Sequence, residues 1–433
     1  MATTLRATPS LRPSPRTGES RPGGSGPPPT QTSGMVRGRA GAHNRCMARG
    51  LTAARVRQDV DVVARAGLDL DTFLEEAVAS VARAVPWVSA CIATHDPVTH
   101  MLTSARKYGD LRDKNSHDHE FGLIEYGTVE PTAFTELARA EVPAAGVSLM
   151  TNGVVERSGR MASFMKPRFG FADEARLAFR DGRDVWGAMA LFRGADDAPF
   201  DEAEVDFLAS LAAPFAHGVR TGMLSRLAEC RPPTTVTGPA VVIVGPDDQI
   251  AQMSLGAEQR LADLDLGVAG GDPLAPVAAL IGAARRYGRG ETTVPPRCRL
   301  RTGSGMWLVL HAGPLISRDG RQGEVVITIE EARPPEIVSI VVAAYGLSPR
   351  ERDVVQLVLQ GVDTKEIAAT LHLSTYTVQD HLKSVFDKAN VRSRRELISR
   401  VYFDQYVPRM GAELTPTGWF VGAEHEAVHR AGA

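Results

Sequence analysis

The feature that most restricts the fold is a run of closely spaced helix-start signals near the C-terminal end of the chain. Ser348 opens the segment "SPRE", in which a serine cap, a proline in the first turn and a glutamate three residues after the cap form a capping box. Asp363 and Ser374 start the next two helices, Gly361 ends the first, and Ser393 starts a fourth. Four short helices joined by tight turns, with the second and third only a few residues apart, predict a helix-turn-helix fold.

The third of these helices has two chemically different faces. Counted at helical spacing, one face is apolar: Val378, Leu382, Val385, Phe386 and Ala389. The opposite face is mainly polar: Tyr376, Gln379, Asp380, Lys383 and Asp387. The apolar face is expected to lie in the core, and in a helix-turn-helix fold the polar face of this helix is offered to the major groove of DNA.

The segment "LSPRERDVVQLVLQGVDTKEIAATLHLSTYTVQDHLKSVFDKANVRSRRELISRV" closely resembles the C-terminal DNA-binding domain of LuxR-type transcriptional regulators. The motifs SPRE, KEIA, TV followed by H, and RSR are specific in combination. The resemblance implies a DNA-binding domain over residues 346–406, with a recognition helix at about 375–389. It further implies double-stranded DNA as a partner, a homodimer on DNA, and contact with RNA polymerase.

The same resemblance assigns roles to individual residues. The base-reading positions of the recognition helix are Gln379, Asp380 and Lys383. Phosphate contacts fall to Lys365, Thr375, Thr377, Arg392, Arg394 and Arg395. In this family the last helix usually makes the dimer, which assigns pairing to Leu397, Val401 and Tyr402. Relatives often carry a basic or apolar residue where Asp380 stands; because an acid repels phosphate but accepts a hydrogen bond from cytosine, their operator preference is not transferred.

Composition sets the limits for the rest of the chain. A length of 433 residues with 43% hydrophobic residues indicates two or three domains with cores of their own. The formal net charge of -2 means that any contact with a polyanion must come from a local basic patch. Four cysteines without a CxxC pair indicate a reducing compartment, and there is neither a signal peptide nor an apolar run of roughly 20 residues. A cytoplasmic protein without membrane contact is expected.

A first α+β domain is predicted over residues 60–228. Order begins near Val60, where apolar residues at helical spacing precede the strand-like "WVSACIAT". Two alternating apolar runs around Asp181 and Gly182 predict a hairpin, and one long amphipathic helix is expected after Asp201. The phrase "WGAMALFRGADDAPFDEAEVDFLASLAAPFA" resembles the C-terminal half of a GAF domain, which implies a sensor architecture.

The remaining segments are a second small domain, a connector and two tails. The segments "AVVIVGPDDQI", "WLVLHAGPLI" and "GEVVITIEEA" are predicted strands and "SLGAEQRLADL" a short helix, an order that resembles a PAS domain over residues 236–331. Cys298 lies in a strand-like "RCRL" and not in the flavin-linking segment of light-sensing PAS domains, and no motif indicates a cofactor. A connector helix is predicted at 335–346, a C-terminal tail at 407–433, and a disordered Arg-, Pro- and Gly-rich leader at 1–55.

The predicted fold class is therefore multidomain: two α+β sensor-like domains, GAF-like and PAS-like, followed by an all-α four-helix helix-turn-helix domain. The chain contains no P-loop, HExxH, G-x-S-x-G or paired-carboxylate motif, so no catalysis is indicated. His117 and His119 lack a third ligand and predict no metal site, and Cys91 is expected to be a small core residue. The predicted function is sequence-specific transcriptional regulation in response to an unknown small-molecule or protein signal. A non-enzymatic interaction adaptor that retains the helix-turn-helix fold is the alternative, and salt-dependent DNA binding separates the two.

Overall fold

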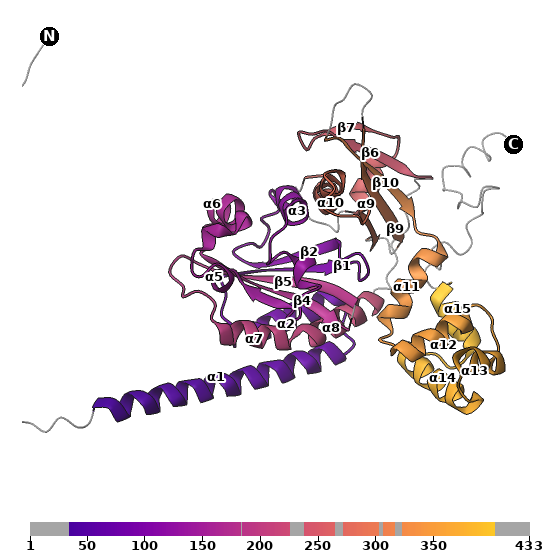
Figure 1. Cartoon of the computed structure of the whole chain (residues 1–433), viewed down its shortest axis with the longest axis horizontal. Helices are drawn as coiled ribbons and strands as arrows, with labels where there is room; N and C mark the ends of the chain where they lie inside the picture. Colours follow the sequence, from indigo (N-terminus) through magenta and orange to yellow (C-terminus); the bar gives the residue numbers. More distant parts are fainter. Residues whose placement is uncertain are drawn as a thin grey trace, which may run out of the picture. The chain divides into compact units, whose positions relative to one another are not determined.

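The computed structural model describes residues 34–182, 184–225, 238–264, 272–302, 306–316 and 323–402 (Figure 1). The chain divides into two compact units, Met1–Arg49 and Gly50–Ala433, and both sheets and the C-terminal helices belong to the second unit. The predicted tail at 407–433 and the first part of the leader lie outside the described residues. None of the helices in the described part of the chain combines the length and the apolar character needed to cross a bilayer.

The prediction of a disordered leader over residues 1–55 is wrong from Gly34 onward. Helix α1 is Gly34–Arg65. The prolines of the leader all precede this helix, so none of them removes a helical hydrogen bond. Toward the C-terminal end of α1, the side chains of Val56, Val60 and Ala64 are buried, so tertiary packing stabilises that end.

The first sheet has five antiparallel strands in the order β2-β1-β5-β4-β3. The strands are β1 (Ser89–His95), β2 (Leu102–Gly109), β3 (Ala144–Gly146), β4 (Asp173–Asp181) and β5 (Asp184–Arg193). The hairpin predicted from sequence is confirmed: β4 pairs with β5, and Gly182 in its turn adopts a left-handed φ of 63°.

Helices cover both faces of this sheet (Figure 1). One face packs against α2 (Leu70–Ala82), α7 (Glu202–Ser210) and α8 (Ala212–Ser225), and buried residues near the C-terminal end of α1 belong to the same apolar cluster. The other face carries shorter helices: α3 (Asp118–Gly127), α4 (Phe134–Leu137), α5 (Val147–Met150), a 3-10 turn (Val155–Arg157), a π-helical turn (Met161–Met165) and α6 (Lys166–Phe169). Side chains that alternate along β4 enter the two layers in turn, as in Leu177 and Ala178.

The single long helix expected after Asp201 is instead two helices. The start is as predicted, since Asp201 and Glu204 form a capping box at the head of α7. The chain then breaks at Leu211, between α7 and α8. Pro214 explains the break, because it has no N–H to donate to the carbonyl of Ser210 and its ring crowds that carbonyl.

The second sheet repeats the strand order of the first, as β7-β6-β10-β9-β8. Its strands are β6 (Ala240–Val244), β7 (Ile250–Met253), β8 (Arg297–Arg301), β9 (Trp307–Pro314) and β10 (Val325–Glu331). One face packs on α9 (Ala257–Leu264), a 3-10 turn (Ala275–Val277) and α10 (Ala278–Gly288), of which α10 was missed from sequence. The other face sends Trp307 and Val309 toward the connector helix α11 (Pro334–Ala344).

The two sheet domains meet where α3 crosses α10. A Cβ atom on Gly282 would lie 2.9 Å from the backbone nitrogen of Gly127 and 2.9 Å from the carbonyl oxygen of Leu123. On the other helix, a Cβ atom on Gly122 would lie 2.7 Å from the Cβ of Ala278. The glycines therefore let the two helix backbones touch, and larger side chains there would separate the domains.

A buried arginine links the two domains to the connector. Arg299 on β8 donates to the carboxylate of Asp96 from Nε at 2.8 Å and from Nη2 at 2.7 Å. Its Nη1 donates to the carbonyl oxygen of Glu336 at 3.0 Å and to Oγ of Ser339 at 2.7 Å, both in α11. Burial opposes ionisation of Asp96, but the hydrogen bonds and charge of Arg299 outweigh it and hold the pKa of Asp96 below its usual value.

The C-terminal region consists of four helices, as predicted. They are α12 (Pro349–Leu359), α13 (Thr364–Leu371), α14 (Thr375–Ala389) and α15 (Arg394–Tyr402). Ser348 and Glu351 form the expected capping box, while Asp363 and Ser374 cap the next two helices with their side-chain oxygens. Val355, Ile367 and Val385 are fully buried between the helices, so the apolar stripes seen in the sequence meet in one core.

Candidate nucleic-acid interface

The turn between α13 and α14 fixes the angle between the two helices. His372 adopts a left-handed φ of 55°, and the N–H of Leu373 donates to the carbonyl of Ala368 at 2.8 Å. Oγ of Ser374 then accepts from the N–H of Thr377 at 3.0 Å and starts α14. The turn is thus closed by local hydrogen bonds that the sequence encodes.

The polar face of α14 is open to solvent. Gln379, Asp380 and Lys383 are exposed, with Lys383 one helical turn beyond the other two, and Tyr376 is 71% exposed at the start of the same helix. On the opposite face Val378 and Val385 are completely buried and hold the helix in place. The three residues predicted to read bases therefore lie together on one exposed face.

The six predicted phosphate contacts divide into two groups. Lys365, Thr375, Arg392 and Arg395 have exposed side chains near α14. Thr377 and Arg394 are half-buried: the Thr377 hydroxyl lies 2.8 Å from Oγ of Ser374, and Nε and Nη2 of Arg394 are enclosed. Exposure thus favours the first group for contact with a polyanion.

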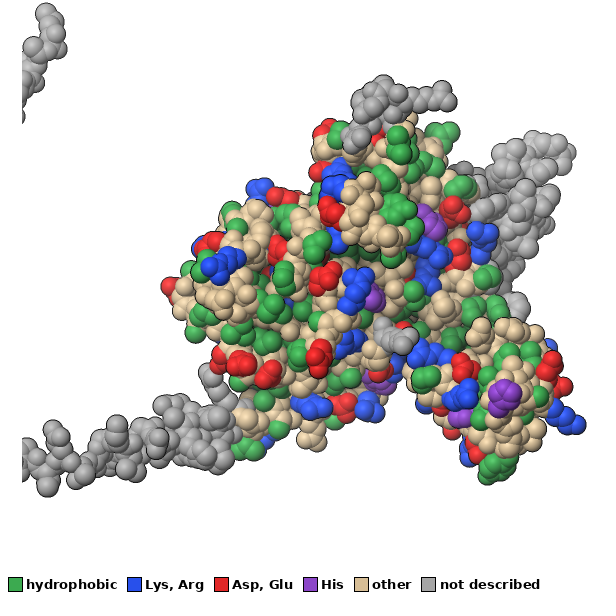
Figure 2. All heavy atoms as spheres, in the orientation of Figure 1, with side chains coloured by type: hydrophobic (Ala, Val, Ile, Leu, Met, Phe, Trp, Pro, Cys, Tyr) green, Lys and Arg blue, Asp and Glu red, His purple; other side chains and the backbone are tan. Residues whose placement is uncertain are grey.

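Charge over this region is mixed. On the face of the C-terminal helices that Figure 2 shows, Lys and Arg side chains are interspersed with Asp and Glu and form no continuous basic patch. Lys388 is engaged in an ion pair, because its Nζ donates to the Glu351 carboxylate at 2.6 Å. Any attraction for a polyanion must therefore come from a few bases held in place around α14.

Glu351 is a structural residue of this site whose further role the sequence reasoning missed. Beyond its capping bond to the N–H of Ser348, its side chain accepts from Oγ of Ser384 at 2.6 Å and from Lys388. Burial opposes its ionisation, but hydrogen bonds from Lys388, Ser384 and Ser348 outweigh it and lower the pKa of Glu351 to about 2. The carboxylate thereby fixes α14 against the start of α12. The signal in the sequence was the "SPRE" glutamate, whose second role depends on residues more than thirty positions away.

The predicted dimerisation stripe is not an exposed surface. Leu397 is completely buried and Val401 is 1% exposed, while Tyr402 is half-buried. Helix α15 packs against α11 and α12 of the same chain, and α11 is apolar along most of its length. In this structure Leu397 and Val401 are therefore not available as a pairing surface, and their role in dimerisation stays a prediction.

Other residues considered from sequence lie in the first domain. Nδ1 of His119 lies 3.1 Å from a carboxylate oxygen of Asp272, while His117 packs edge-on against Phe164 and Phe169. Across the described residues, no group of three His, Cys, Asp or Glu side chains is arranged to hold a metal ion.

Comparison with known proteins gives a family for the C-terminal helices. Residues 346–401 match the GerE model, described as bacterial regulatory proteins of the luxR family. An HTH-type transcriptional regulator of Mycobacterium tuberculosis (strain H37Rv) is 48% identical over 53 residues, which cover 12% of this chain and 6% of that protein. The monoamine regulon transcriptional regulator of Klebsiella aerogenes is 41% identical over 56 residues, or 13% of this chain and 25% of that protein. The chain thus covers about a quarter or less of the length of these relatives.

Solved structures resemble the chain only distantly. The match to a Vibrio cholerae VqmA dimer, described as a LuxR-type receptor, spans 38% of this chain and 82% of the VqmA chain. The sequence identity is 17% and the TM-score is 0.19. The match to the A. aeolicus nlh2 GAF domain spans 42% of this chain and 99% of the GAF-domain chain, with 12% sequence identity and a TM-score of 0.25. These likenesses assign nothing to individual residues. The family match and the four capped helices agree on the same segment: residues 346–401 form a helix-turn-helix domain of the luxR family of bacterial regulatory proteins.

Proposed function

We propose that the chain is a sequence-specific DNA-binding transcriptional regulator whose helix α14 enters the major groove. The observation that carries the proposal is the face of α14 on which Gln379, Asp380 and Lys383 are exposed together while the opposite face is buried. The match of residues 346–401 to the luxR family supports it.

The three side chains have complementary chemistry for base edges. Lys383 donates to the acceptors of guanine, Gln379 offers a donor and an acceptor to adenine, and Asp380 accepts from the amino group of cytosine. Arg392 and Arg395 supply positive charge for phosphates beside the groove. Because the whole chain carries a net charge of -2, binding depends on these local contacts.

The proposal extends to regulation by the two sheet domains. Arg352 of α12 forms an ion pair with Asp184 at the β4–β5 hairpin, at 3.2 Å. On the other side, Arg299 connects Asp96 of the first domain to the start of α11. A signal that shifts either sheet domain therefore acts on the helices that carry α14.

Pairing of two copies on DNA half-sites is also part of the proposal. Because Leu397 and Val401 are buried and α11 packs against α15, pairing through these residues requires that the packing around α15 opens. The contact of α11 with α15 would then oppose pairing until a signal displaces it.

Selection from a random duplex library with the full chain, followed by fluorescence anisotropy, tests the DNA-binding proposal. Lys383→Ala and Gln379→Ala should each cost about 1–3 kcal/mol on the selected duplex and weaken preference at one base pair. Arg395→Ala should weaken binding to every duplex and reduce the slope of log K against log[salt] by about 0.9.

Gln356→Ala provides the control, because Gln356 is exposed on α12 and outside the proposed surface. If the chain selects no sequence and its binding does not depend on salt, the C-terminal domain acts in protein contacts and the adaptor alternative holds. If Lys383→Ala and Gln356→Ala reduced DNA affinity equally, α14 would not be the helix that reads bases.

A further inference from the structure

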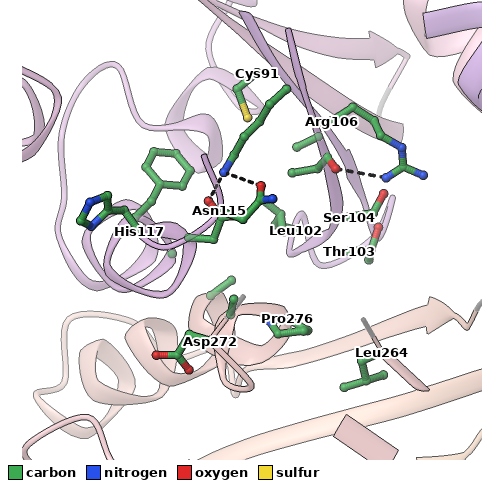
Figure 3. Close-up of a pocket in the computed structure, with 18 of the residues that line it drawn as sticks. Cys91, Leu102, Thr103, Ser104, Arg106, Asn115, His117, Leu264, Asp272 and Pro276 are labelled. Atoms are coloured by element: carbon green, nitrogen blue, oxygen red, sulfur yellow. Dashed lines mark hydrogen bonds and ion pairs between the residues drawn. The ribbon is translucent and has the colours of Figure 1, made fainter. Parts of the chain in front are cut away.

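A cavity of about 510 Å³ lies between the two sheet domains (Figure 3). Its volume falls within the roughly 300–1,000 Å³ typical of small-molecule sites. Figure 3 shows Asn115 and His117 of the first domain on one side of it and Leu264, Asp272 and Pro276 of the second on the opposite side. The cavity is therefore complete only when both domains are in place.

The wall from the first domain is aromatic. Five phenylalanines line it: Phe121, Phe134, Phe164, Phe169 and Phe192. The ring of Phe164 meets that of Phe169 edge-on at 5.7 Å, and the π-helical turn Met161–Met165 brings Phe164 and Met165 to the cavity. Rings in edge-on and stacked contacts favour a flat aromatic partner over an aliphatic one of equal size.

The wall from the second domain is mostly apolar, with Glu258 and Asp272 as its two acidic residues. It is formed by Ile250, Met253, Leu261, Leu264, Pro276 and Ala279. Met253 on β7 is 45% exposed although it belongs to the cavity lining, so part of the apolar lining faces solvent. A ligand that covers this residue gains burial of apolar surface from both domains at once.

The cationic and anionic groups that face the cavity from the first domain are already paired. Nζ of Lys107 contacts the carboxylate of Asp118 and donates to Oδ1 of Asn115 at 3.1 Å and to the carbonyl of Lys114 at 2.5 Å, which uses all three of its donors. Nε of Arg106 is 2.7 Å from the carboxylate of Asp71. An anionic ligand would have to compete with these carboxylates and would also meet those of Glu258 and Asp272 from the second domain, whereas a neutral one leaves the pairs intact.

Neutral hydrogen-bonding groups of the first domain also line the cavity. The hydroxyls of Thr103 and Ser104 line it from β2 and share Oγ1 of Thr94, at 2.7 and 2.6 Å. The oxygen of the Asn115 amide accepts from Lys107, which leaves the amide nitrogen as a donor toward a ligand. The site thus combines aromatic walls with a few uncharged polar atoms.

We propose that this cavity binds one neutral, planar aromatic molecule that carries a hydrogen-bonding heteroatom, and that this molecule is the signal for the regulator. The first part stands on the cavity alone, while its role as a signal rests on the function proposed above. Because the ligand touches both sheet domains, its binding stabilises one relative position of them, and by linkage it alters DNA affinity by the same factor by which DNA alters ligand affinity.

The test uses the full chain without DNA and three neutral bicyclic probes: indole, quinoxaline and 2-naphthol. Saturation-transfer NMR and calorimetry compare each with its anionic counterpart: indole-3-carboxylate, quinoxaline-2-carboxylate and 2-naphthoate. We expect at least one neutral probe to bind and its carboxylate to bind at least ten-fold more weakly. If none of the neutral probes binds, or if the carboxylates bind equally well, the proposal is overturned.

A matched pair of variants locates the binding. Met253→Trp places a large side chain over the cavity from an exposed position. This variant should weaken binding of the neutral probe at least ten-fold without disturbing the core. Leu255→Trp adds the same side chain two residues away at a fully exposed position outside the lining, and should leave affinity unchanged. If the two variants bound the neutral probe with equal affinity, the probe would bind outside the cavity and the assignment would be overturned.

DNA titrations are then repeated with and without the bound probe. A change in DNA affinity supports the signalling role, and no change overturns that role while leaving the binding site intact. Since the binding experiment contains no DNA, failure of the DNA-binding proposal and failure of the cavity proposal are distinguishable.

Discussion

The two sheets follow the same strand order along the chain, yet they are filled with different side chains. The first is packed with phenylalanines, and buried charges cross one of its layers. The second domain, residues 236–331, contains no phenylalanine at all, and its core consists mainly of Val, Ala, Leu and Ile. The aromatic rings that line the cavity all come from the first domain.

From this comparison we infer that the strand order determines how sheet and helices are layered in each domain. The volume of the side chains then determines which layer can hold a ligand. In the first domain, the layer of short helices α3 to α6 borders the cavity. In the second, one face is filled by α9 and α10 and the other packs on α11. One domain provides most of the cavity, and the other covers it and contacts the connector.

The largest effect should come from the charge network inside the first domain. Arg176 is completely buried; its Nη2 is 2.8 Å from the carboxylate of Glu125 and its Nε is 3.2 Å from that of Glu174. Arg176→Met leaves two buried carboxylates with one partner fewer, and should lower the free energy of unfolding by about 3–5 kcal/mol in urea denaturation.

Arg260→Met is the counterpart in the second domain. Arg260 pairs with Glu331 at 2.9 Å, but the Glu331 side chain is 11% exposed and can be hydrated. Arg260→Met should therefore lower the free energy of unfolding by less than Arg176→Met does. Equal losses for the two variants would mean that the contrast in burial between the domains has no energetic weight.

The next largest effect on stability is expected at the crossing of α3 and α10, where the two sheet domains meet. In an open helix, Gly→Ala stabilises by roughly 0.5–1 kcal/mol, but a Cβ on Gly282 would meet two backbone atoms at 2.9 Å. The clash should prevail, so Gly282→Ala is expected to destabilise by about 1–3 kcal/mol. Thermal unfolding measures it, with Gly313→Ala as control, since a Cβ at Gly313 meets nothing within 4 Å. A rise in melting temperature for Gly282→Ala would show that the helices are not in backbone contact.

A smaller effect concerns the ion pair between the domains and depends on pH. Because the pKa of Asp96 is lowered in the folded protein, its contribution is complete above the unfolded value of about 3.9 and is lost as the pH falls through the lowered folded pKa. Asp96→Asn should cost about 1.5 kcal/mol at pH 7 and flatten the acid decline of stability below about pH 4. Urea titrations from pH 7 to pH 3 check both, and parallel pH profiles would contradict the assignment.

The smallest effect is on thiol reactivity. Burial raises the pKa of Cys91 to about 12 and raises that of Cys298 as well, so both should react slowly with iodoacetamide at pH 8. Cys91 lines the cavity and Cys298 does not. In a Cys46→Ser, Cys230→Ser background, a neutral aromatic probe should slow alkylation of Cys91 alone. Equal protection of both thiols would indicate a general tightening of the fold and no occupant beside Cys91.

Sequence predicted the parts of this fold that local rules control. The hairpin at Asp181 and Gly182, the strands β1, β6, β9 and β10 and the four C-terminal helices follow from alternation, turn residues and caps within a few positions, whereas β2, β3 and β7 were not predicted. Helix α10 was missed because its Gly282 has meaning only against α3, far away along the chain. The break at Leu211 was missed although Pro214 was visible, because the apolar period continued across it.

The C-terminal site shows the same limit. The exposed face of α14 was readable from helical spacing, since Val378 and Val385 mark the buried side. The covering of Leu397 by α11 was not, because an apolar stripe looks the same whether its partner is a second copy or a neighbouring helix. The cavity required two domains to meet, and no local pattern encodes that.

The contact of Arg299 with the first turn of α11 has a mechanical consequence. Glu336 and Ser339 lie near one end of this helix, and the chain continues from the other end into α12. From Glu336 to Ala344 the helix is about 12 Å long, so a tilt of about 10° at the arginine moves the far end by about 2 Å. That displacement is more than half of the 3.4 Å rise of one base pair. A small rotation between two sheets is thus amplified by a lever to the scale on which neighbouring bases are distinguished.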